Sequence, residues 1–340
     1  METISRKKVY IGIAVLIVVI AGGFALSTIS KKNIEISGGL IDRMGTSETP
    51  GTPKPNQKSP LTGMECATAN ARPFAIMISS DKEARPLSGI GEADMVFEMP
   101  VVDNGFTRMM AVYQCGRPKE LGSVRSSRLD FIPLALGLDA IYAHFGGEHT
   151  ALEELNNGII DNIDGLKYDG TIYYRKPNIP KPHNAFTNFT LLAQAVSELG
   201  YSTLNSNLSY PHEKDSGSFD QVNPATIYNS PFQVNWTYNK NSNSYFRTRA
   251  GLSEIDKNTG KQVESKNVVI MKTTWSPINK DYIRVKTVGN GGVLIYKDGQ
   301  VFNGTWEKKD DKSKLYFYDA NHKEIEFAPG NIWVEVVTTN

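Results

Sequence analysis

The chain has few residues of the kinds that usually mark a chemical site. Its 340 residues include only two cysteines and five histidines. It contains no P-loop, dinucleotide-binding fingerprint, HExxH, CxxC or nucleophile elbow, so the sites that those motifs mark are not predicted. His144 and His149 do not have a recognisable metal spacing. We therefore predict no metal site and no cofactor.

The chain also lacks an excess of either charge. It has 37 basic and 36 acidic residues, which gives a formal net charge of +1. Proteins that bind nucleic acid usually carry a strongly basic face, so no nucleic-acid partner is predicted. A local cluster of basic residues therefore cannot be ascribed to a generally basic composition.

Only one long apolar run occurs, at residues 9–26, directly after the basic triplet 6–8. At a rise of about 1.5 Å per residue, a helix of this length covers about 27 Å and can span a bilayer. The basic flank predicts an N-terminus inside the cell. We expect a cytoplasmic tail at 1–8, a transmembrane anchor or signal segment at 9–27 and a flexible extracytoplasmic linker at 28–59. A cleaved signal peptide is the alternative, and it places the rest of the chain outside the cytoplasm as well.

The two cysteines, Cys66 and Cys115, bear on this location. Outside the cytoplasm a pair of cysteines is compatible with one disulfide. Two buried free thiols are the alternative, and the sequence leaves both open. No cysteine follows the apolar run, so lipid attachment at that point is not predicted.

Beyond residue 60 the pattern indicates two parts. Apolar runs of strand length at 73–80, 93–100, 107–115 and 139–145, with a helical pattern at 188–201, predict an α/β or α+β domain with a mixed sheet at 60–215. Alternating and apolar segments between turns predict a β-rich domain at 216–340. The Asp-Gly pair in 297–300 predicts a tight hairpin.

The first candidate site is GSVRSSR at 122–128, which contains Arg125, Ser126 and Arg128. A helix is predicted to begin here, capped by Ser127 or by Asp130, and two guanidinium forks at a helix start favour an anion. On a helix the two arginines would share a face. The alternative is a capped helix whose arginines are solvated or paired with carboxylates.

Three further segments supply candidate ligand-binding residues. A strand that ends in HFGG predicts a ligand contact at a sheet edge, and a loop with basic and aromatic residues suits an anionic or carbohydrate ligand. An arginine and a glutamate on neighbouring strands could form a buried pair or orient a site. The residues are His144, Gly146 and Gly147 in the first segment, Tyr173, Arg175, His183 and Asn184 in the second, and Arg108 and Glu98 in the third.

Seven motifs in one order carry a resemblance. They are PLTG at 60–63, ARPLSGIGEADMVFE at 84–98, GFTRMMAVYQ at 105–114, GSVRSSR at 122–128, DAIYAHFGG at 139–147, DG..YYR at 169–175 and PHN.FT at 182–187. The set resembles the YerB-like bacterial lipoprotein family of the cell envelope, over roughly residues 60–340. The resemblance implies an extracytoplasmic, membrane-held protein with a two-part folded region, and no particular reaction. Family members attach through a lipidated cysteine after the signal, and this chain has none there.

Two functions follow as hypotheses. The first is a binding module for an anionic wall polymer, a glycan fragment or an envelope protein, held to the membrane by its N-terminal helix. The second is a hydrolase or transferase acting on wall glycan or phosphodiester, with Glu98, His144 and His183 as acid and base groups. Under both hypotheses we expect Arg125 and Arg128 to point into a cleft that they share with His144.

Overall fold

The computed structural model describes residues 57–103, 106–204, 209–214, 217–220, 225–229, 232–280 and 282–339. The predicted tail at 1–8, the membrane segment at 9–27 and most of the linker at 28–59 lie outside these residues. Within the described ranges, no helix is long and apolar enough to cross a membrane. Residues 57–59 of the predicted linker belong to the fold, since Ser59 is buried and its hydroxyl donates to Gln114 Oε1 at 2.7 Å.

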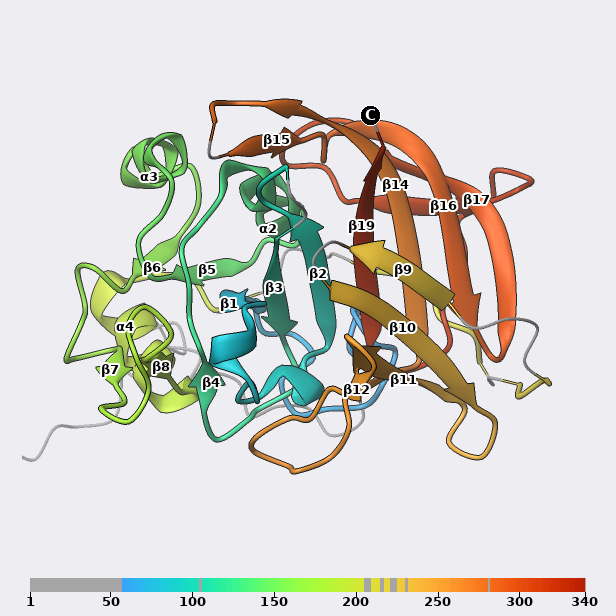
Figure 1. The fold of residues 1–340 in the computed structure, drawn as a ribbon, viewed down its shortest axis with the longest axis horizontal. Coiled ribbons are helices and arrows are strands. Elements are labelled where there is room, and N and C mark those ends of the chain that lie inside the picture. The colour runs from blue at the N-terminus through green and yellow to red at the C-terminus, as the bar shows by residue number, and fades with distance from the viewer. Residues whose placement is uncertain are drawn as a thin grey trace, which may run out of the picture. The chain divides into compact units, whose positions relative to one another are not determined.

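An 11-stranded mixed sheet runs through the molecule (Figure 1). Its main path is β18 (Tyr316–Asp319), β17 (Gln300–Lys308), β16 (Gly289–Lys297), β14 (Asn267–Pro277), β19 (Ile332–Thr339), β2 (Met95–Pro100), β3 (Thr107–Tyr113), β1 (Phe74–Ser79), β5 (Ile141–His144) and β6 (Asn162–Asp164), and β15 (Ile283–Val285) pairs with β14. β19 pairs in parallel with both β14 and β2. The late strand β19 therefore joins strands from both predicted parts into one sheet.

Two smaller sheets complete the β-structure. One contains β12 (Leu252–Ser253), β11 (Ser244–Arg249), β10 (Phe232–Asn239), β9 (Ala225–Asn229) and β13 (Glu264–Ser265); the other contains β4 (Leu121–Gly122), β8 (Ala185–Thr187) and β7 (Tyr174–Arg175). The predicted fold class is confirmed: helices accompany the mixed sheet in the first part, and the second part is rich in strands. The predicted boundary between 215 and 216 stays a prediction.

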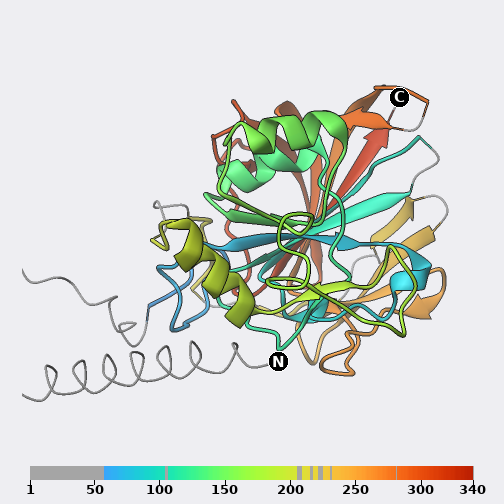
Figure 2. The ribbon, with the colours of Figure 1, turned by 90° about the vertical axis from the view of Figure 1, so that its left-hand side faces the viewer.

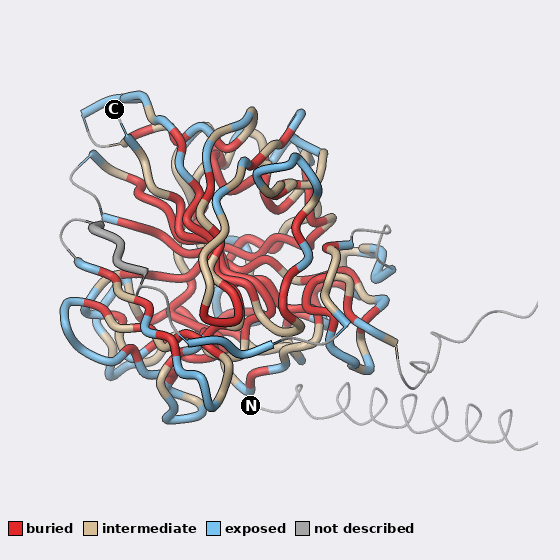
Figure 3. Tube along the Cα trace, turned by 90° about the vertical axis from the view of Figure 1, so that its right-hand side faces the viewer, coloured by how far each residue is buried: buried red, intermediate tan, exposed pale blue. Residues whose placement is uncertain are grey.

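Helices cover both faces of the large sheet (Figure 2). On one face α2 (Ile132–Gly137) and α3 (His149–Asn156) pack against one apolar cluster, and on the other α4 (Phe189–Leu199) joins a second. The second cluster includes Trp236 from β10 and Trp333 from β19, whose rings meet edge to face at 5.2 Å. Figure 3 shows the central strands buried along their length, as expected for strands covered on both faces.

Local sequence explains several element ends. The Asn188 side chain accepts the Leu191 N–H at 3.0 Å and Gly200 closes α4 with φ 67°, so this predicted helix is confirmed. The predicted hairpin is also confirmed: Asp298 and Gly299 both have positive φ between β16 and β17.

The predicted start of the helix after the arginines is wrong. A short 3-10 helix, η3 (Leu129–Phe131), comes first, and α2 follows with Pro133 in its first turn. Neither Ser127 nor Asp130 caps a helix, because the Asp130 carboxylate accepts the Val285 N–H at 2.9 Å instead. Arg128 has extended backbone, so Arg125 and Arg128 do not share a helix face.

Cys66 and Cys115 are joined by a disulfide across 49 positions of the chain. The bond links the segment before β1 to the residue two places after β3. In the chain-entropy picture, closing a loop of this size stabilises the fold by about 4 kcal/mol.

Candidate functional site

Basic side chains gather where β1 ends. Arg108 lies at the start of β3 opposite Ser79, and the Arg125 N–H donates to the carbonyl of Met77 at 2.9 Å. This pairing brings two arginines that are 17 positions apart to one end of β1. Arg128 follows before η3. We call Asp81, Arg108, Arg125, Arg128 and His183 the arginine cluster.

The contacts of the arginine cluster leave it short of negative charge. Arg125 Nη2 lies 3.6 Å from Asp81 Oδ2, and Arg125 Nη1 lies 3.3 Å from His183 Nδ1. His183 Nδ1 is 3.8 Å from the same Asp81 oxygen. Arg128 donates to the Ser127 carbonyl, and its guanidinium lies 4.8 Å from the centre of the Tyr282 ring. The cluster thus combines three arginines with one aspartate, and of the three only Arg125 lies within ion-pair distance of that aspartate among the described residues.

Arg108 is the unusual member of the cluster. Its side chain is only 5% exposed, yet its Nε and Nη1 have no hydrogen-bond partner. Within the described part of the chain no carboxylate forms an ion pair with it. Burial, together with the charges of Arg125 and Arg128, lowers the pKa of Arg108 to about 9. Arg108 is therefore a buried cation that remains charged at neutral pH, and although the Asp81 charge acts on it, no carboxylate of the described residues lies within ion-pair distance.

The other titratable groups of the cluster respond to this positive field. Burial would raise the pKa of Asp81, but the Ser79 hydrogen bond and the charges of Arg108 and Arg125 together hold it below its usual value. Burial and the Arg125 charge lower the pKa of His183. At neutral pH the cluster thus holds an ionised aspartate and a neutral histidine.

A pocket of about 240 Å³ adjoins the cluster and shares Arg125 with it. Its lining consists of Val124, Arg125, Ser126, Phe145, Arg175, Lys181 and Pro182, and we call it the outer pocket. Arg175 is held in place there: its guanidinium stacks 3.9 Å above the Phe145 ring and bonds to Asp169 and to Asn184 Oδ1. The charged residues that line this pocket are all cations.

The structure places His144 and its glycines elsewhere. His144 is fully buried; its Nδ1 lies 2.8 Å from the Gly146 carbonyl oxygen and its Nε2 lies 3.3 Å from Asn162 Oδ1. The prediction of a cleft that Arg125 and Arg128 share with His144 is therefore wrong, although the two segments are adjacent, since the Phe145 N–H donates to the Arg125 carbonyl. Gly146 has φ +67° and serves the turn.

Two more of the predicted ligand-binding residues serve packing and hydrogen bonding within the fold. Tyr173 is fully buried and its hydroxyl donates to the Ile163 carbonyl at 2.7 Å, so it faces no ligand. A Cβ on Gly147 would lie 3.0 Å from Leu152 Cδ2, so this glycine allows close packing against α3. The Asn184 side chain accepts a hydrogen bond from Arg175, and its carbonyl accepts one from the Lys176 N–H.

Glu98 belongs to a second group of charges, on the opposite face of the sheet. Opposite Glu98 in the β2–β3 ladder is Met109, while opposite Arg108 is Met99, so Glu98 and Arg108 point to opposite faces. The prediction that they could pair is wrong. Glu98 instead forms ion pairs with Arg247 and Arg249 of β11, the latter at 2.5 Å.

These charges form what we call the buried ion network: Arg85, Glu98, Arg247, Arg249, Glu254 and Glu335. Arg247 and Glu98 are 0% exposed. Burial would raise the pKa of Glu98, but the charges of Arg249 and Arg247 lower it. Burial and the neighbouring Glu98 raise the pKa of Glu335. Three arginines here meet three glutamates.

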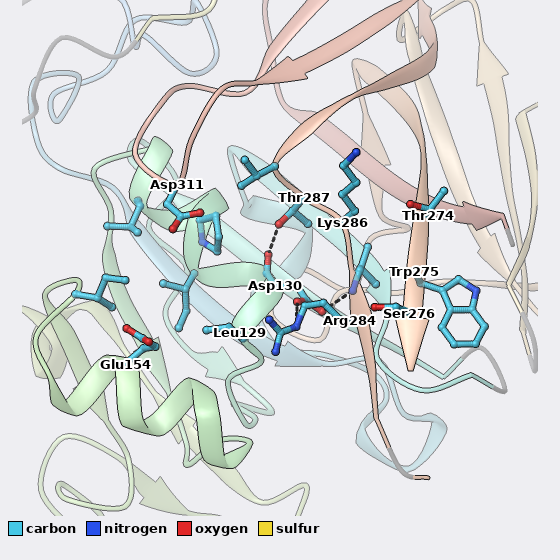
Figure 4. Close-up of a pocket in the computed structure, with 16 residues that line it drawn as sticks. Leu129, Asp130, Glu154, Thr274, Trp275, Ser276, Arg284, Lys286, Thr287 and Asp311 are labelled. Carbon is cyan, nitrogen blue, oxygen red and sulfur yellow. Dashed lines mark hydrogen bonds and ion pairs between the residues drawn. The ribbon is translucent and has the colours of Figure 1, made fainter. Parts of the chain in front are cut away.

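A larger cavity of about 560 Å³ lies between α2 and the strands β14 and β15 (Figure 4). Asp130, Arg284 and Thr287 meet at its centre: Arg284 Nε is 3.0 Å from Asp130 Oδ1, and the Thr287 hydroxyl donates to the Asp130 carbonyl. None of the predicted site residues lines this cavity. Its central charges neutralise each other, unlike those of the arginine cluster.

Comparison with known proteins agrees with this architecture. Two family models match the chain, the N-terminal domain of a protein of unknown function (DUF3048) over residues 61–202 and the C-terminal domain of the same family over residues 225–334. A curated relative is YerB of Bacillus subtilis (strain 168), named as a candidate lipoprotein; it is 29% identical over 297 residues, which are 82% of this chain and 86% of YerB. The crystal structure of the B. subtilis YerB protein matches with a TM-score of 0.74 and 26% identity, covering 84% of this chain and 97% of that one.

The chain belongs to the YerB-like family. In this YerB-like chain the large sheet crosses from the first family domain into the second through the β2–β19 pair. The arginine cluster lies mainly in the first domain, and Tyr282 of the second reaches it by stacking on Arg128.

Sequence reasoning on the YerB-like chain missed several residues of both charge groups. Asp81 lies two positions after the end of β1, where polar residues often reach a site. Arg247 and Arg249 alternate along one strand and Glu335 interrupts an apolar run, so a search for charges inside apolar strands could have found the buried ion network. No local signal in the sequence identifies Tyr282.

Proposed function

We propose that this protein is an extracytoplasmic, membrane-held binding protein of the cell envelope and that its arginine cluster binds an anionic group. The ligand would belong to a wall polymer, a glycan fragment or an envelope protein. Membership in the YerB-like family and the lipoprotein name of the B. subtilis relative support the location. The excess of arginines over carboxylates in the arginine cluster supports an anionic ligand.

The mode of attachment is a finer part of the proposal. The apolar run at 9–26 would anchor the chain as a single-pass helix with its N-terminus inside. The name of the YerB relative points to a lipid instead. No cysteine follows the run in this chain, so we propose the helix.

Arg108 is the observation that carries the binding proposal. A buried guanidinium without hydrogen-bond partners destabilises a fold. Residues that destabilise a fold in this way are usually retained where function requires them. A bound anion would supply acceptors to Arg108 and relieve the mutual repulsion of the three arginines. Neutral His183 could donate one further hydrogen bond from its ring nitrogen.

The enzymatic alternative has less support. Glu98 and His144 are both 0% exposed and hold partners within the fold, so neither reaches a substrate. Only His183 of the three predicted acid and base groups lies in the arginine cluster. Binding without catalysis is therefore the function that the geometry favours.

The proposal is tested by sulfate, a doubly charged anion that does not titrate near neutral pH. The full-length chain in non-ionic detergent should melt at a higher temperature in sodium sulfate than in sodium chloride of equal ionic strength. At about 100 times the dissociation constant the added stability is about 2.7 kcal/mol. Sulfate also stabilises folded proteins generally, so the comparison between variants is what counts. Arg108→Met and Arg125→Gln should each show a smaller shift than the unmodified chain, whereas Lys167→Gln, which changes an exposed lysine that bonds Asn156, should show the full shift. An equal sulfate shift in Arg108→Met and Lys167→Gln would overturn the proposal.

A further inference from the structure

The arginine cluster and the outer pocket form one continuous positive surface. Arg125 belongs to both, and His183 of the cluster follows Lys181 and Pro182 of the pocket in the chain. No carboxylate is among the residues that line the outer pocket, although Asp169 pairs with Arg175 at 3.0 Å, and Asp81 is the carboxylate within ion-pair distance of Arg125 and His183 among the described residues. The surface therefore has room for more than one negative group.

The two ends of this surface differ in depth. Arg108 and Arg128 at the inner end are mostly buried, and Arg128 Nε also lacks a hydrogen-bond partner. Lys181 at the outer end is exposed, and Arg175 is held over Phe145 by its contacts with Asp169 and Asn184. One anionic group could be enclosed at the inner end while the next remains partly in solvent.

The arrangement of the arginines favours a tetrahedral anion at the inner end. A planar carboxylate offers two oxygens, and in the buried ion network two guanidinium groups are enough for Glu98, with Arg249 on Oε1 and Arg247 on Oε2. Arg108 comes from β3, whereas Arg125 and Arg128 come from the segment before η3. Donors that arrive from separate elements suit a phosphate, whose oxygens point in several directions.

On these grounds, and resting on the proposed function, we infer that the ligand is a linear polymer of phosphodiester units. One phosphate lies in the arginine cluster and the next lies in the outer pocket between Arg125, Arg175 and Lys181. The Ser126 hydroxyl, which also lines that pocket, can donate to the second phosphate. The exposure of Lys181 lets the polymer continue into solvent.

The inference is tested by comparing probes of different length. The full-length chain in non-ionic detergent is titrated with inorganic phosphate, glycerol 3-phosphate and a synthetic tetramer of glycerol phosphate, with calorimetric detection. Two linked phosphates bind the two ends of the surface together, so the tetramer should bind about ten-fold or more tighter than glycerol 3-phosphate. Poly-glutamate of equal charge, a polyanion without phosphodiester units, serves as the competing polyanion and should bind more weakly.

Variants separate this inference from the proposed function. Lys181→Ser should weaken the tetramer about five-fold or more while leaving inorganic phosphate unchanged. Arg108→Met should remove the binding of both, and Lys167→Gln should change neither. If phosphate binds but the tetramer binds no tighter, or if poly-glutamate binds as tightly as the tetramer, the polymer inference fails and the proposed function stands. If no anion binds, both fail.

Discussion

Two groups of three arginines lie in the described part of the molecule, and Arg108 of one group and Glu98 of the other point to opposite faces of the same sheet. In the buried ion network Arg85, Arg247 and Arg249 each have a glutamate partner. In the arginine cluster only Arg125 lies within ion-pair distance of a carboxylate, as far as the described residues go. Arg108 and Arg249 are both 5% exposed, so for this pair the difference lies in charge balance and not in depth.

This contrast separates a structural role from a binding role. Burying a charge is tolerated when an opposite charge and hydrogen bonds compensate the lost solvation, and the buried ion network provides both. The arginine cluster lacks that compensation and therefore retains the capacity to bind an anion. Burial of an arginine alone would not have distinguished the two.

The largest effect is expected from Arg247→Met in the buried ion network. The substitution would leave Glu98 and Glu254 buried without Arg247, and breaking a buried ion pair from one side costs about 3–5 kcal/mol. Urea denaturation of the full-length chain measures it. Lys240→Met, which breaks the exposed pair with Asp220, is the matched control and should cost less than about 1 kcal/mol. Equal losses in the two variants would contradict the assignment.

The same substitution in the arginine cluster should act in the opposite direction. Arg108→Met removes a buried cation that lacks partners and adds an apolar side chain next to Met99. We expect the free energy of unfolding, measured in chloride buffer, to rise by about 1–3 kcal/mol. A loss as large as that of Arg247→Met would mean that Arg108 is compensated within the fold.

The smallest effect concerns the pH dependence of sulfate binding. Burial and Arg125 lower the pKa of His183, so the ring is neutral at pH 7 and a bound anion should raise that pKa. Affinity should therefore increase about five-fold as the pH falls from about 7.5 to about 5.5. Asp81 remains ionised over this range because its pKa is lowered, and Arg108, with a pKa of about 9, remains charged.

His183→Gln is the control for this pH dependence. Calorimetric titration with sulfate should show weak, pH-independent binding in the variant, because glutamine keeps a donor but cannot gain a proton. If the pH dependence persists in His183→Gln, another titratable group causes it. The exposed Glu83, whose charge acts on His183, would be the next group to test.

The sequence predicts the strands and helices of this fold better than it predicts which strands pair with each other. Strand runs, the capped helix α4 and the Asp-Gly hairpin follow from local preferences. The insertion of β19 between β14 and β2 depends on long-range pairing that no local pattern encodes. The same limit applies to the site. Arg125 and Arg128 were identifiable from composition, but the direction of the Arg108 side chain depends on the strand register. A register shift of one residue would place the Arg108 side chain on the face of the sheet that carries Glu98.

The position of β19 also has a consequence for how the protein reaches its folded state. Of the described strands β19 is the last to be synthesised, yet it lies in the interior of the large sheet. Until β19 is made, β2 and β14 each present an unpaired edge. The two halves of the large sheet are then not joined by the hydrogen bonds that β19 makes to β14 and β2. Because synthesis runs from the N-terminus to the C-terminus, the chain must hold an incomplete sheet until β19 has been made, and the sheet closes only at that late stage.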